Sequence, residues 1–138
     1  MRIRNLAKDP QAHEKMPHWG GCSDTKNDDG TWTYSPNKSG VTFSPNFYPV
    51  LTGNVFIIES SKGDLGFLSA DNLKDFPIVG TVRDRYRVYR LVGGHCIIQY
   101  FSTAPWNPVG FAICDPDAYD LLQNAGLPLV FAATDRPY

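Results

Sequence analysis

RYRVYRLVGGHCIIQYFS, residues 85–102, is the stretch that decides the expected fold. Two runs rich in aromatic and β-branched residues flank Gly93-Gly94, and such a two-residue loop is typical of a tight β-hairpin because the favoured turns need positive φ. Side chains alternate between the two faces of a strand, so Arg90 and His95 would share one face of this hairpin. The stretch therefore predicts two antiparallel strands paired with each other.

Other short runs of the same kind surround it, bounded by turn-forming residues. Residues 31–34 and 41–44 are interpreted as a second hairpin, and residues 17–30 as a loop before it. Further strands are expected at 54–60, 65–68, 78–82, 110–114 and 129–133. Because hairpins dominate, the sheet should be mostly antiparallel.

Two short helices are predicted from the same signal. Asp9-Pro10 and Asp115-Pro116 each place an aspartate at the N-cap and a proline at the first helical position. The first helix would end before Pro17 and the second at Gly126. The predicted fold class is therefore α+β: a mostly antiparallel sheet with a short N-terminal helix and one C-terminal helix.

One local segment has a known counterpart. Residues 63–73, GDLGFLSADNL, resemble the closing segment of bacterial SH3-like domains, in which a strand carrying an aromatic residue is followed by a short helical turn. The resemblance implies a helical turn at residues 69–73.

Length and charge narrow the class of protein. The chain has 138 residues, which fits a single domain covering 1–138. Its net charge of −1 argues against binding that depends on nucleic-acid phosphates. Because no apolar run is long enough for a membrane span and the N-terminus lacks a signal-peptide core, we expect a cytoplasmic protein.

The cysteines and the glycine motifs point to no cofactor. Cys22, Cys96 and Cys114 are far apart and form no CxxC pair, so we expect free thiols in a reducing compartment. The chain contains no phosphate-binding glycine loop and no GxSxG nucleophile elbow. We therefore expect no bound cofactor.

A metal site is one alternative. His13, His18 and Cys22, followed by Asp24, are ligand-type residues at close spacing. Structural zinc sites need four ligands and usually draw on two paired clusters, and no second pair is visible here. The competing interpretation makes His13 an exposed helix residue and Cys22 a small buried one.

The basic strand offers a second alternative. This strand carries four arginines within eight residues, interleaved with Tyr86 and Tyr89: Arg83, Arg85, Arg87 and Arg90. The arginines could hold phosphates, and the tyrosines could stack on bases. His95 and Arg90 on one sheet face would suit a metal-independent ribonuclease, similar to the sheet-based toxin ribonucleases of bacteria, with His95 moving protons and Arg90 stabilising charge. The competing interpretation is an edge strand whose charges prevent aggregation.

Without a common catalytic signature, we expect a non-enzymatic binding or inhibitory accessory protein of the kind that phages and mobile elements encode. Its partner is expected to be a protein, with nucleic acid as the alternative and no membrane contact. Aromatic residues and arginine are enriched at interface hot spots. The expected binding residues are Arg83, Arg85, Arg87, Arg90, Tyr86, Phe47, Tyr48 and Trp106.

Overall fold

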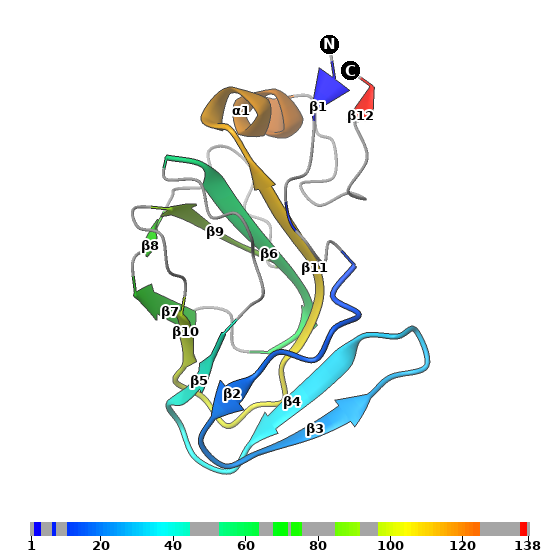
Figure 1. The fold of residues 1–138 in the computed structure, drawn as a ribbon, viewed down its shortest axis with the longest axis vertical. Helices are drawn as coiled ribbons and strands as arrows, with labels where there is room; N and C mark the ends of the chain where they lie inside the picture. The colour runs from blue at the N-terminus through cyan, green and yellow to red at the C-terminus, as the bar shows by residue number, and fades with distance from the viewer. Residues whose placement is uncertain are drawn as a thin grey trace.

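The structure is a computed structural model that describes residues 2–3, 7, 11–44, 53–63, 68–71, 73–75, 85–91, 97–124 and 136–137 (Figure 1). Its elements in chain order are β1 (Arg2–Ile3), β2 (His18–Trp19), β3 (Cys22–Lys26), β4 (Trp32–Pro36), β5 (Val41–Phe43), β6 (Val55–Lys62), β7 (Leu68–Asp71), β8 (Leu73–Asp75), β9 (Tyr86–Leu91), β10 (Ile97–Tyr100), β11 (Asn107–Cys114), α1 (Pro116–Asn124) and β12 (Arg136–Pro137).

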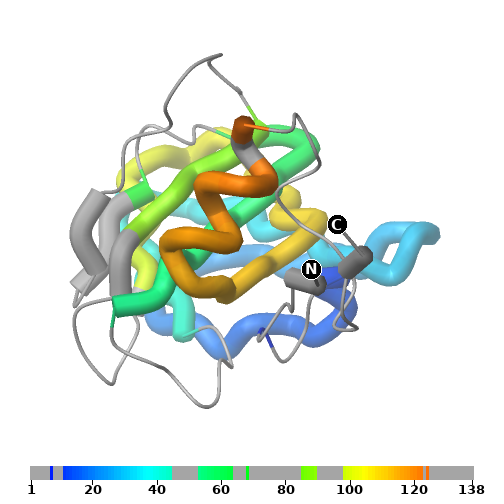
Figure 2. Tube along the Cα trace, turned by 90° about the horizontal axis from the view of Figure 1, so that it is seen from above, coloured from blue at the N-terminus to red at the C-terminus, as the bar shows by residue number. Residues whose placement is uncertain are grey.

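The elements are stacked in three layers. Strands β2, β5, β10 and β7 pair in that order as one antiparallel sheet, the outer sheet, and β11, β6, β9 and β8 form a second, the central sheet. One face of the central sheet packs toward the outer sheet. Helix α1 covers the opposite face and crosses over the strands (Figure 2). The β3–β4 hairpin lies at the opposite end of the molecule from α1 (Figure 1).

Strand β6 shows why the central sheet is covered on both faces. Val55 and Ile57 pack with α1, whereas Phe56 and Ile58 pack toward the outer sheet. All four side chains are fully buried, and burying a side chain of this size contributes about 1.5–3 kcal/mol. The continuous apolar run VFII is thus explained by a strand that is buried on both sides.

One buried amide ties the β3–β4 hairpin to the central sheet. Asn107 Nδ2, at the start of β11, donates to Thr31 Oγ1 at 3.0 Å and to the carbonyl oxygen of Trp32 at 2.8 Å. Its Oδ1 accepts a hydrogen bond from the Ser61 hydroxyl on β6. Three segments far apart in the sequence are therefore held by a single side chain.

The C-terminal helix is confirmed and the N-terminal helix is wrong. Asp115 caps α1 as predicted, because its Oδ1 accepts a hydrogen bond from the Ala118 N–H at 2.8 Å. Residues 11–17 contain no helix, and Ala12 has a φ of +55°, which a right-handed helix does not allow. Ala12 and Met16 are buried in the core in a non-helical conformation. A helix of two turns is only marginally stable by itself, so the packing of these side chains decides the local backbone conformation.

No helix in the described residues is long and apolar enough to cross a membrane.

Both predicted hairpins are wrong, although their strands exist. Strand β9 pairs with β6 and β8, and β10 pairs with β5 and β7, so both edges of each strand are already occupied by other partners. Arg90 lies opposite Val55 and Lys74, not opposite Ile97. In the same way β4 pairs with β3, inside the segment expected to be a loop, and β5 pairs with β2 and β10.

The helical turn implied for residues 69–73 is also wrong. Strand β7 runs through Asp71 and pairs with β10, and β8 begins at Leu73 and pairs with β9. These two strands therefore belong to different sheets, and the chain passes between the sheets at this point. The strands expected at 78–82 and 129–133, and Gly93-Gly94 itself, lie outside the described residues.

Candidate functional site

The face of the outer sheet that points away from the core carries exposed aromatic rings. Trp19 on β2 lies opposite Thr42 on β5, which lies opposite Gln99 on β10. Phe101 follows two residues after Gln99, and its ring lies beside Gly40, where a Cβ would be 4.0 Å from Phe101 Cε1. We call Trp19, Thr42, Gln99 and Phe101 the aromatic face.

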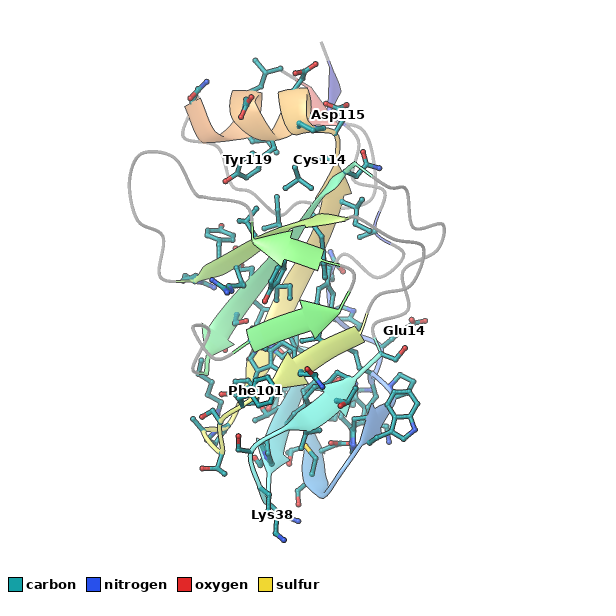
Figure 3. All side chains as sticks on the ribbon, turned by 90° about the vertical axis from the view of Figure 1, so that its left-hand side faces the viewer. Glu14, Lys38, Phe101, Cys114, Asp115 and Tyr119 are labelled. Atoms are coloured by element: carbon teal, nitrogen blue, oxygen red, sulfur yellow. The ribbon has the colours of Figure 1, made fainter. Side chains whose placement is uncertain are left out.

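The two rings of the aromatic face are the large exposed hydrophobic side chains of the described residues. Trp19 is 59% exposed and Phe101 is 45% exposed; Phe101 is labelled in Figure 3. Phe43 and Tyr100, at alternate positions of β5 and β10, are fully buried. Period-two alternation therefore explains which rings are exposed, and it is also the signal that could have identified Phe101 in the sequence.

Trp106, an expected binding residue, lies in the core instead. It has no exposed surface, and its indole N–H donates to Ser60 Oγ at 3.0 Å. Its ring centroid lies 5.1 Å from that of Phe43 and 5.6 Å from that of Tyr100. Its buried position leaves no surface of this side chain for a partner.

The two arginines of this strand region whose side chains are described, Arg85 and Arg87, already have partners. Arg85 forms an ion pair with Glu59 at 3.4 Å. The Arg87 guanidinium lies 5.3 Å from the centroid of the Tyr89 ring and donates from Nε to its hydroxyl at 3.3 Å. Tyr86 is half-buried against the core under α1. Both guanidinium groups therefore pack locally.

The remaining candidates have no described side chain. Arg83, Phe47, Tyr48 and His95 lie outside the described residues, and only the backbone of Arg90 is described. The pairing that would have brought Arg90 and His95 together is absent from the described sheets, because β9 and β10 do not pair.

Three side chains with metal-ligand chemistry converge at the edge of the outer sheet. His18 on β2, with Cys22 and Asp24 on β3, each place one candidate ligand atom within 4.8 Å of the others. His18 Nε2 lies 2.7 and 2.9 Å from the two Asp24 carboxylate oxygens. All three residues are partly buried. We call them the His18 cluster.

The glycine turn between β2 and β3 builds this cluster. Gly20 has a φ of +115°, a backbone conformation that residues other than glycine rarely adopt. A Cβ on Gly21 would lie 2.9 Å from Asn37 Nδ2, which is too close for an ordinary contact. The turn brings Cys22 and Asp24 of β3 back to His18 of β2. Period-two alternation then points Cys22 and Asp24 to the same face.

Aromatic rings and one cation surround the His18 cluster. The His18 ring meets Tyr34 and Phe43 edge-on, with centroids 6.3 and 5.7 Å apart. Lys15 Nζ lies 3.9 Å from Asp24 Oδ2, and the Lys15 side chain is about half exposed. The cluster therefore has an apolar inner wall and the half-exposed ammonium group of Lys15 at its outer side.

The electrostatics of the cluster oppose a free thiolate. Burial, and then the charge and hydrogen bond of Asp24, raise the pKa of the Cys22 thiol from its ordinary 9.0 to about 11. Catalytic cysteines need the opposite shift. Cys114, at the end of β11, is buried, and burial together with Asp115 raises its pKa to about 12.

His13 does not belong to the cluster. Its ring lies 3.2 Å from where a Cβ on Gly30 would sit, at the turn of the β3–β4 hairpin, and its carbonyl oxygen accepts a hydrogen bond from Trp32 Nε1 at 3.1 Å. Of the alternative ligand set His13, His18 and Cys22, the structure therefore brings together His18 and Cys22, with Asp24 beside them.

Comparisons of the chain with protein-family models, with curated proteins and with solved structures found no match.

Proposed function

We propose that this chain is a non-enzymatic binding protein that docks on a protein partner through the aromatic face. The observation that carries the proposal is the pair of exposed rings, Trp19 and Phe101, on one side of the outer sheet. Burying two such rings in an interface would remove a large apolar area from water, which is the main driving force for association. Tryptophan is the residue type most enriched at interface hot spots.

The polar residues between the rings support a protein partner. Thr42 and Gln99 are half-buried and offer hydrogen-bonding groups in the middle of the aromatic face. A centre that combines rings with a few polar groups is typical of protein interfaces. The net charge of −1, and the pairing of Arg85 with Glu59, leave little basis for phosphate contacts.

The chemistry of the described thiols supports a binding role over catalysis. The pKa of Cys22 is raised to about 11 and that of Cys114 to about 12, whereas a nucleophilic thiol needs a lowered pKa. An inhibitory role would follow if the aromatic face covered a working surface of its partner.

Site-specific photocrosslinking in the cells that encode the protein tests this proposal. A benzophenone amino acid at Thr42, in the middle of the aromatic face, should yield a defined crosslinked protein. The same group at Asn124, which is exposed at the end of α1 and at the far end of the molecule, is the matched control and should yield none (Figure 1).

The double variant Trp19→Ser, Phe101→Ser should abolish the crosslink from Thr42. A crosslink to nucleic acid, a crosslink to a second copy of the chain, or equal products from Thr42 and Asn124 would each refute the proposal. Arg85→Ala should leave the crosslink unchanged, because Arg85 lies on the central sheet side of the molecule, next to β9.

A further inference from the structure

We propose that the His18 cluster is a binding site for one divalent transition-metal ion, with His18, Cys22 and Asp24 as its three protein ligands. The donor set of one nitrogen, one sulfur and one oxygen is suited to Zn²⁺ and excludes Ca²⁺ and Mg²⁺, which take oxygen ligands. The inference does not depend on the proposed protein partner.

Distances in the cluster are close to those that a metal requires. Its three ligand atoms lie within 4.8 Å of one another, and His18 Nε2 is 2.7 Å from the nearer Asp24 oxygen. With Zn–N and Zn–O bonds of about 2.0 Å, tetrahedral angles would separate these two atoms by about 3.3 Å. The His18–Asp24 pair therefore has to open by roughly half an ångström, and the Cys22 sulfur, within 4.8 Å of both, has to approach by up to about 1.3 Å to reach a Zn–S bond of about 2.3 Å.

The charges of the ligand set balance those of the ion. A Cys22 thiolate and the Asp24 carboxylate together carry two negative charges, and His18 binds as the neutral imidazole. A divalent cation then leaves the partly buried site neutral, which limits the cost of desolvation.

A simple His–Asp ion pair is the competing interpretation, and it accounts for only part of the cluster. It explains the contact of His18 with Asp24 but gives no reason for a thiol on the same side of β3. Three protein ligands leave a fourth position for water or for a ligand from another molecule.

Two features limit the expected affinity. His18 Nδ1 is buried and has no hydrogen-bond partner in the described part of the chain, whereas metal-bound histidines usually donate from the second ring nitrogen. Lys15, 3.9 Å from Asp24, competes with the ion for the carboxylate. We therefore expect weaker binding than in closed four-ligand zinc sites, and tighter binding when Lys15 is removed.

Cobalt(II) titration of the tag-free full chain tests the site, because thiolate-to-cobalt charge transfer absorbs in the near ultraviolet and reports sulfur ligation directly. One Co²⁺ per chain should bind with this band, and one equivalent of Zn²⁺ should remove it. Cys22→Ser should abolish the band, and His18→Gln and Asp24→Asn should each weaken binding by at least about tenfold.

His13→Gln and Cys114→Ala are the matched controls, since both residues lie outside the cluster, and each should keep the band and the affinity. Circular dichroism without metal identifies any ligand variant that fails to fold. For that case Lys15→Ala provides a second test, because Lys15 is about half exposed and its loss should tighten Co²⁺ binding several-fold. The proposal is overturned by a missing band in the unaltered chain, by a band that survives Cys22→Ser, or by unchanged affinity in Lys15→Ala.

Discussion

His18 and Trp19 are consecutive residues of one two-residue strand, and they lie on opposite faces of the outer sheet. The His18 ring packs edge-on against Phe43 in the core, whereas Trp19 is 59% exposed. Alternation along β2 thus separates the proposed metal ligand from the proposed partner contact. The two surfaces can be altered independently although their residues are adjacent in sequence.

Truncation of Trp19 and of Trp106 should change the free energy of unfolding by very different amounts. Trp19→Ala should change the free energy of unfolding by about 0.5 kcal/mol or less, because Trp19 is mostly exposed. Trp106→Ala should lower it by about 3–5 kcal/mol, because it leaves a cavity between the sheets and removes the hydrogen bond to Ser60. Urea unfolding measures both values. Similar losses from the two variants would contradict the assigned positions of these rings.

The Asn107 side chain should contribute strongly to stability, because it attaches the β3–β4 hairpin to the central sheet. Asn107→Ala removes the hydrogen bonds to Thr31 and Trp32 and the one from Ser61, while Thr31 Oγ1 keeps its hydrogen bonds with Asn27 and Asp29, so the free energy of unfolding should fall by about 2–3 kcal/mol. The control is Asn124→Ala, at an exposed position at the end of α1, with an expected change below about 0.5 kcal/mol. Hydrogen exchange should also become faster in β4. Equal stability of the two variants would show that the hairpin is held by other contacts.

Alkaline pH should destabilise the fold through Cys114. Folding raises the pKa of this thiol from 9.0 to about 12, so between these values the unfolded chain has lost a proton that the folded chain retains. Unfolding then releases a proton, and the free energy of unfolding falls as pH rises above about 9, by about 1.4 kcal/mol per pH unit for a single group. The cause of the raised pKa is the burial of Cys114, at the end of β11, under α1 and near Tyr119 (Figure 3).

The Cys114→Ala variant isolates this contribution from lysines and tyrosines that titrate in the same range. Urea unfolding at pH 8, about 9.5 and about 10.5 should show a shallower loss of stability in the variant than in the unaltered chain. Parallel pH profiles of the free energy of unfolding would mean that the Cys114 thiol ionises as easily in the folded chain as in the unfolded chain, which would contradict the prediction.

The local chemistry of the sequence determined several features directly. Aspartate before proline indicated the start of α1, where the Asp115 side chain accepts a hydrogen bond from a free backbone N–H, whereas the same pair at Asp9-Pro10 is followed by no helix in residues 11–17. Runs of β-branched and aromatic residues located six of the twelve described strands, namely β4, β5, β6, β9, β10 and β11. The close spacing of His18, Cys22 and Asp24 indicated ligand-type chemistry in this segment, although the predicted set also contained His13. These signals act within a few residues, so they need no knowledge of distant segments.

Only the tertiary structure decided which strands pair and which rings are exposed. Strands β9 and β10 are close in sequence, yet each has its partners in a different sheet, because both faces of β9 and the inner face of β10 are buried against distant segments. The same packing drew Ala12 and Met16 into the core in place of a helix, and it buried Trp106 while leaving Phe101 exposed. Burial depends on residues far along the chain, and local propensity carries no information about them.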